Sequence, residues 1–131
     1  MGLVARIALL LVLALAAGCG GTEAAGDDRP PRYDLTITYW PAGRGGEART
    51  ATLMCDPDGG SHPDPVGACD ALLQHEDALK PVAGDVACTQ IYGGDQEATA
   101  IGRGVDAAFS RANGCEIARW DKLAPLLDLS G

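Results

Sequence analysis

Five cysteines constrain this 131-residue chain more than any other feature. One of them, Cys19, follows an apolar run near the N-terminus, and the other four are Cys55, Cys69, Cys88 and Cys115. These four are separated by 14, 19 and 27 residues, so they contain no CxxC pair of the kind that binds zinc. Four cysteines allow three disulfide pairings. The pattern predicts a disulfide-bonded protein from an oxidising compartment, with no metal ion and no cofactor.

Residues 1–18 have the features of a bacterial lipoprotein signal peptide. Arg6 precedes an apolar run, residues 7–17, that is too short to span a membrane. Small residues before Cys19 resemble the site at which such a cysteine becomes the first mature residue and is lipidated through its sulfur. The alternative is plain secretion after cleavage at a nearby small residue. Either route predicts an extracellular protein, secreted or lipid-anchored on the outer face of the cell membrane.

Residues 19–32 have the composition of a flexible tether, with a Pro30-Pro31 pair and no large apolar side chain. Cleavage before Cys19 removes Arg6, so the formal net charge of −8 becomes −9. An acidic surface argues against nucleic acid as a partner and against attraction to anionic lipid. We therefore expect membrane contact only through the N-terminal lipid.

Residues 33–131 are predicted to form one small domain with a thin core. The chain contains a single phenylalanine, so the core must be built from smaller aliphatic side chains and the two tryptophans. Small exported domains of this kind usually need disulfides. In the chain-entropy model each of two bridges would contribute about 3–4 kcal/mol.

The apolar pattern along this domain predicts strands at both ends of a helical segment. Apolar and polar residues alternate over 35–40 and 51–55, which predicts an antiparallel hairpin. Residues 98–101 and 105–109 are predicted to be two further short strands.

Helical periodicity appears twice. Over 66–79 it places four apolar residues on one face and ends before Pro81; these are Cys69, Leu72, Leu73 and Leu79. Over 117–127 it predicts a C-terminal helix that Pro125 interrupts. The sequence thus predicts an α+β domain, in which two helices pack on one face of an antiparallel sheet.

Residues 88–94 read as a short, extended loop with fixed ends. A cysteine can fix its start, and a Gly93-Gly94 pair allows a sharp turn at its end. Thr89, Ile91 and Tyr92 between them favour an extended backbone.

The chain offers little catalytic chemistry. Its histidines are His62 and His75, and the sequence contains no GxSxG motif to align Ser61 or Ser110 with either of them. A hydrolase would need a serine, a histidine and an acid to converge. We therefore expect a protein that is not an enzyme.

Several motifs resemble the Streptomyces subtilisin inhibitor family, and they occur in the family's order between about residues 34 and 120. The first run is Leu53-Met54-Cys55-Asp56-Pro57-Asp58-Gly59-Gly60-Ser61-His62-Pro63, followed by Ala68-Cys69-Asp70-Ala71-Leu72. The others are Cys88-Thr89-Gln90-Ile91-Tyr92 and Phe109-Ser110-Arg111-Ala112-Asn113-Gly114-Cys115-Glu116.

The resemblance implies a fold, a disulfide pairing and a function. It implies Cys55–Cys69 and Cys88–Cys115 bridges, a subtilisin-like serine protease as partner, and the homodimer common in the family. The implied reactive bond joins Gln90 to Ile91, with Thr89, Tyr92 and Gly93 contacting the enzyme. Gln90 departs from the large apolar or basic residue typical of the family.

A rival hypothesis is a surface lipoprotein that keeps the inhibitor scaffold as a binding module without inhibiting. An exposed, rigid loop at residues 88–94 would favour inhibition, and a loop packed down on the domain would favour the rival.

Overall fold

The computed structural model describes residues 29–131. The predicted signal peptide, Cys19 and residues 19–28 of the predicted tether therefore lie outside the described residues. The elements in chain order are β1 (Tyr33–Trp40), β2 (Arg49–Cys55), α1 (Pro65–Gln74), the 3-10 helix η1 (Glu76–Leu79), β3 (Glu97–Gly102), β4 (Val105–Ser110), α2 (Gly114–Lys122) and α3 (Ala124–Leu127). No helix in this described part of the chain is long and apolar enough to cross a membrane.

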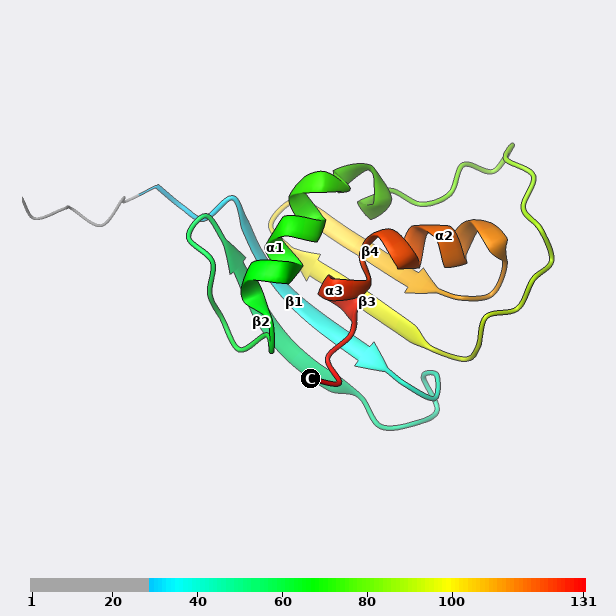
Figure 1. Cartoon of the computed structure of the whole chain (residues 1–131), viewed down its shortest axis with the longest axis horizontal. Helices are drawn as coiled ribbons and strands as arrows, with labels where there is room; N and C mark the ends of the chain where they lie inside the picture. The colour runs from blue at the N-terminus through cyan, green and yellow to red at the C-terminus, as the bar shows by residue number, and fades with distance from the viewer. Residues whose placement is uncertain (1–28) are drawn as a thin grey trace, which may run out of the picture. The chain divides into compact units, whose positions relative to one another are not determined.

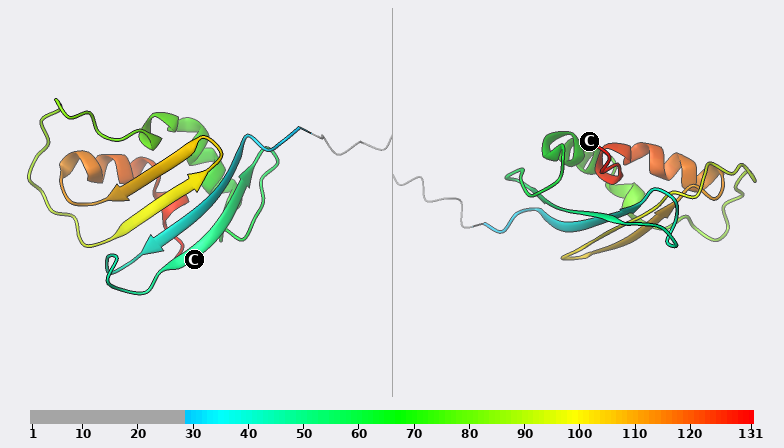
Figure 2. Two further views of the ribbon diagram at one scale, coloured as in Figure 1. Left: turned by 180° about the vertical axis from the view of Figure 1, so that it is seen from behind. Right: turned by 90° about the horizontal axis from the view of Figure 1, so that it is seen from below.

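The four strands form one antiparallel sheet in the order β2-β1-β3-β4. The helices lie together on one face of it (Figure 1; Figure 2, right). α1 packs on β2 and α2 packs on β4, while α3 contacts α1 and β1. The predicted α+β architecture is confirmed.

The alternating residues of the strands supply the sheet side of the core. Leu35 and Ile37 of β1 are fully buried, as are Leu53 of β2 and Ala100 of β3. Leu35 lies opposite Leu53, and Ile37 lies opposite Ala100, so the register stacks apolar side chains on the helical side. Phe109 of β4 is also buried there. Of the two tryptophans predicted in the core, Trp120 is buried and Trp40 is only half-buried.

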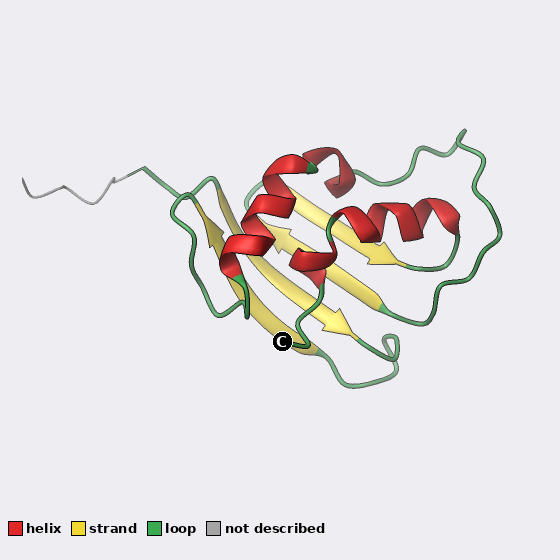
Figure 3. Ribbon diagram, in the orientation of Figure 1, coloured by secondary structure: helices red, strands yellow, loops and turns green. Residues whose placement is uncertain are grey.

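The first helix is shorter than the sequence predicted. α1 begins at Pro65, where the Asp64 side chain accepts a hydrogen bond from the Gly67 amide at 3.0 Å, and it ends at Gln74. His75 leaves the helical conformation, and residues 76–79 continue as the 3-10 helix η1 (Figure 3). The helix therefore stops well before Pro81. The predicted apolar face is confirmed at Cys69 and Leu72, which are buried, and is wrong at Leu73, which lies inside α1 and is 41% exposed. Ala68 and Ala71 complete the buried face.

The C-terminal helix is interrupted as predicted. α2 ends at Lys122 and α3 begins at Ala124, with Pro125 in its first turn, where the missing amide hydrogen leaves no bond unmade. Leu123, Leu126 and Leu127 are fully buried.

The Cys55–Cys69 disulfide joins the end of β2 to α1 inside the core. Its Cα atoms are 5.6 Å apart, and both cysteines are at most 1% exposed. This is the helix-to-sheet bridge that the resemblance implies.

Candidate reactive loop

Residues 80–96 connect η1 to β3 without forming a helix or strand, and they include the predicted 88–94 loop. The connection passes the N-terminal end of α2 (Figure 1). Within it, Ile91 is 60% exposed and Tyr92 is 63% exposed, and Thr89 and Gln90 are exposed too. Two neighbouring apolar side chains thus face solvent in a chain with a small core.

Two backbone hydrogen bonds hold the ends of this exposed stretch. The Gly114 amide donates to the Thr89 carbonyl at 2.9 Å, and the Gly93 amide donates to the Arg111 carbonyl at 2.7 Å. Within residues 29–131, neither the amides nor the carbonyls of the three residues between these anchors, 90–92, take part in a backbone hydrogen bond. The main chain of Gln90 and Ile91 is therefore free to pair with another chain.

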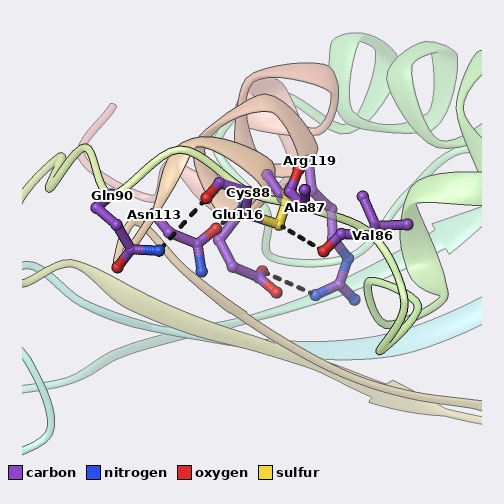
Figure 4. Close-up of a disulfide and its surroundings, with 8 residues drawn as sticks. Val86, Ala87, Cys88, Gln90, Asn113, Glu116 and Arg119 are labelled. Carbon is purple, nitrogen blue, oxygen red and sulfur yellow. Dashed lines mark hydrogen bonds and ion pairs between the residues drawn. A yellow bond between two sulfur atoms is a disulfide. The ribbon is translucent and has the colours of Figure 1, made fainter.

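The second disulfide adds a covalent anchor next to the first hydrogen bond. Cys88 is bonded to Cys115, with Cα atoms 5.3 Å apart, and this is the second bridge that the resemblance implies (Figure 4). Both ends of the exposed stretch are thereby tied to one short segment, residues 111–115, which runs from the end of β4 into the first turn of α2.

The side chains of the loop make short local contacts. Gln90 Nε2 donates to the Cys88 carbonyl at 3.3 Å (Figure 4), and the Tyr92 hydroxyl donates to the Asp95 carboxylate. Both contacts are exposed, so they bias the side chains without burying them.

The two glycines after Tyr92 suit their positions for different reasons. A β-carbon at Gly93 would lie 2.8 Å from Ile117 Cδ1 and 3.1 Å from Arg111 Cβ, so a larger residue would displace the Ile117 side chain. Gly94 has a φ of +126°, which L-residues rarely adopt. The backbone bends at Asp95, directly after the glycine pair.

Arg119, which sequence reasoning missed, ties α2 to η1 and β4, and the first turn of α2 carries Gly114 and Cys115. Arg119 is 7% exposed, and its guanidinium donates to the carbonyls of Ala78 at 2.7 Å, Ala108 at 2.6 Å and Leu79 at 3.2 Å. It also stacks over Phe109, 4.3 Å from the ring centroid. An arginine in the last turn of a short helix usually faces solvent, so the sequence held no signal for this role.

His62 is the second residue whose role was missed, since it was predicted only as part of a turn. Its ring is buried, and its Nδ1 accepts from the Asp64 amide at 3.0 Å. Nε2 therefore carries the proton and donates to the Leu126 carbonyl, also at 3.0 Å. His62 thus joins the turn before α1 to α3 and lies outside the loop.

Comparison with known families finds one match. Residues 30–113, more than half of the chain, match the family described as subtilisin inhibitor-like. No curated protein matches the chain significantly. The family consists of protease inhibitors that are not enzymes, and together with the two disulfides it indicates an extracellular protein.

Proposed function

We propose that this chain, which belongs to the subtilisin inhibitor-like family, inhibits secreted subtilisin-like serine proteases by presenting residues 89–93 as a substrate. The reactive bond in this proposal joins Gln90 to Ile91. The observation that carries it is an exposed three-residue stretch between two backbone anchors, beside a disulfide.

The loop suits the active-site cleft of a protease. Extended peptides bind such clefts as an added strand, with main-chain hydrogen bonds supplying affinity and one side chain filling the primary pocket. In this proposal Gln90 fills the pocket, and Thr89, Tyr92 and Gly93 contact the enzyme on either side. Because the anchors fix the loop before binding, less conformational entropy is lost on association.

The side chain of Gln90 narrows the choice of target. A trypsin-like pocket carries a carboxylate that requires a cation, so it would bind Gln90 poorly. The broad, largely apolar pocket of subtilisins accommodates an uncharged side chain of this length. The proposed partner is therefore a subtilisin-like enzyme.

We also propose that the mature chain is anchored through Cys19 or secreted, and that it forms a homodimer, as is common in the family. Mass spectrometry of the protein from a bacterial membrane fraction tests the lipid on Cys19, and sedimentation equilibrium tests the dimer.

The rival hypothesis of a non-inhibiting surface module predicts a loop packed down on the domain. The 60% and 63% exposure of Ile91 and Tyr92 favours inhibition instead.

The direct test uses residues 20–131, expressed in an oxidising compartment and titrated against subtilisin with a chromogenic substrate. We expect stoichiometric, slowly reversible inhibition. Rapid cleavage after Gln90 would mean that the loop is bound but too loose to inhibit. Neither inhibition nor cleavage would favour the rival module.

A further inference from the structure

We infer that Arg111 is the positioning residue that keeps the Ile91 side of the loop in place after the Gln90–Ile91 bond is cut, so that the protease reseals the bond. This inference rests on the proposed function. It concerns what makes the loop an inhibitor, because a substrate with the same exposed sequence would simply be hydrolysed.

Arg111 contacts Gly93 with both its backbone and its side chain. Its carbonyl accepts from the Gly93 amide at 2.7 Å, and its Nε donates to the Gly93 carbonyl at 3.3 Å. Gly93 is therefore held at both polar groups of its backbone. The side chain of Ile117 also packs against Gly93.

Other residues fix the guanidinium of Arg111 in turn. Its Nη1 lies 3.0 Å from Asp121 Oδ1 on α2, and its Cζ lies 5.9 Å from the centre of the Trp120 ring. The Arg111 side chain is 23% exposed, so water screens these contacts less than those of a surface arginine. Nε is then directed to Gly93 before any protease binds.

The two sides of the reactive bond are held in different ways. On the Gln90 side, the Cys88–Cys115 disulfide and the Gly114 hydrogen bond to Thr89 survive cleavage. Residues 91–96 contain no cysteine, and the first anchor after the bond is the Arg111–Gly93 contact, two residues away. Cleavage would therefore free the Ile91 amine unless Arg111 holds Gly93.

The chemistry that this anchor favours is the reverse of acylation. In the forward step the protease serine oxygen bonds to the Gln90 carbonyl carbon, the C–N bond breaks, and the nitrogen of Ile91 takes the proton. In the reverse step the Ile91 amine attacks the acyl carbon and the serine oxygen leaves with that proton. An amine held near the acyl carbon competes with water at a high effective concentration.

The test follows the ratio of cut to intact inhibitor at equilibrium with a catalytic amount of subtilisin, measured by mass spectrometry from both directions. The variants are Arg111→Met, which keeps the aliphatic stem, and Asp121→Asn, an exposed change that only releases the guanidinium. Arg32→Ala is the matched control, because Arg32 also has a carboxylate partner and an aromatic neighbour, Glu76 and Tyr33.

We expect Arg111→Met to raise the cut-to-intact ratio about tenfold or more and to shorten inhibition, as loss of a charge-assisted hydrogen bond predicts. Asp121→Asn should change the ratio in the same direction by a smaller factor, and Arg32→Ala should leave it unchanged. An equal shift in Arg32→Ala would indicate a general loss of stability and would overturn the inference.

The outcomes separate the inference from the proposed function. If the wild type inhibits and neither Arg111→Met nor Asp121→Asn changes the ratio, the positioning role is wrong and the inhibitory function stands. If the wild type is neither cut nor inhibitory, both are wrong. Should Arg111→Met not fold, Asp121→Asn alone decides the positioning role.

Discussion

The two disulfides have different roles in the same small domain. Cys55–Cys69 is fully buried between β2 and α1, surrounded by the core. Cys88–Cys115 is half-buried at the surface, where it joins an irregular loop to the start of α2. The first bridge holds two regular elements together, whereas the second holds a stretch that forms no element of its own. We therefore assign Cys55–Cys69 mainly to the stability of a domain with a thin core, and Cys88–Cys115 mainly to the conformation of the loop.

The largest expected effects come from replacing both cysteines of one disulfide by alanine and comparing the two double variants. The chain-entropy cost of either pair is about 3–4 kcal/mol, but the buried pair also leaves a cavity in the core, so its total is about 4–5 kcal/mol. Urea unfolding measures these losses. Cys55→Ala/Cys69→Ala protein that remains folded should still inhibit, whereas Cys88→Ala/Cys115→Ala should become a substrate. Equal inhibition by the two folded variants would contradict the division of roles.

The contacts of Arg119, which join α2 to η1 and β4, can be tested by substitution. Arg119→Met leaves three backbone carbonyls without their donor, so we expect the free energy of unfolding to fall by about 3 kcal/mol. Arg44→Met is the control, because Arg44 pairs with Glu97 at an exposed site and should cost less than about 1 kcal/mol. Chemical denaturation of both variants gives the comparison, and similar losses would show that burial of Arg119 is unimportant.

Substitution of His62 tests the part of the core that lies away from the loop. His62→Ala removes the acceptor for Asp64 and the donor to Leu126, and should cost about 2 kcal/mol. His75→Ala, at a half-buried position without those partners, should change stability little. Inhibition by folded His62→Ala should match the wild type, because its contacts lie outside residues 80–96 and 111–115. Weakened inhibition would mean that the two regions are coupled.

The smallest expected effect is a loss of stability in acid. The hydrogen bond from Tyr33, together with the charge of Arg32, holds the pKa of Glu76 below its ordinary value. Lys122 lowers the pKa of Asp77 in the same way. The unfolded chain therefore binds protons at higher pH than the folded one, so stability falls as the pH drops through about 4 and below. Thermal melts between pH 6 and pH 3 should show this fall, and Glu76→Gln should flatten it.

The sequence was sufficient to predict the regular part of the fold. Alternation over 35–40 and 51–55 identified β1 and β2, because one face of each strand is buried and the other is not. The C-terminal break at Pro125 was equally visible. The end of α1 was not, since the change to η1 after His75 follows from packing rather than from a Pro or Gly.

The position of the candidate loop was predicted from the sequence, but the contacts that Arg111 and Arg119 make were not. Cys88 and the glycine pair are local signals, and they marked the ends of the exposed stretch correctly. The contact between Arg111 and Gly93 joins residues 18 positions apart through an irregular connection, where no periodicity relates them. Arg119 was missed for a similar reason, because its carbonyl partners belong to η1 and β4.

The central claim is that Gln90 occupies the primary pocket of a protease, and Gln90→Lys tests it most directly. Because the Gln90 side chain is exposed and, among residues 29–131, pairs only with the Cys88 carbonyl, the substitution should leave the fold unchanged. The variant is titrated against trypsin, whose pocket carries a carboxylate. We expect the wild type to inhibit trypsin weakly and Gln90→Lys to inhibit it strongly. A folded Gln90→Lys protein that inhibits neither trypsin nor subtilisin would contradict the assignment of the loop.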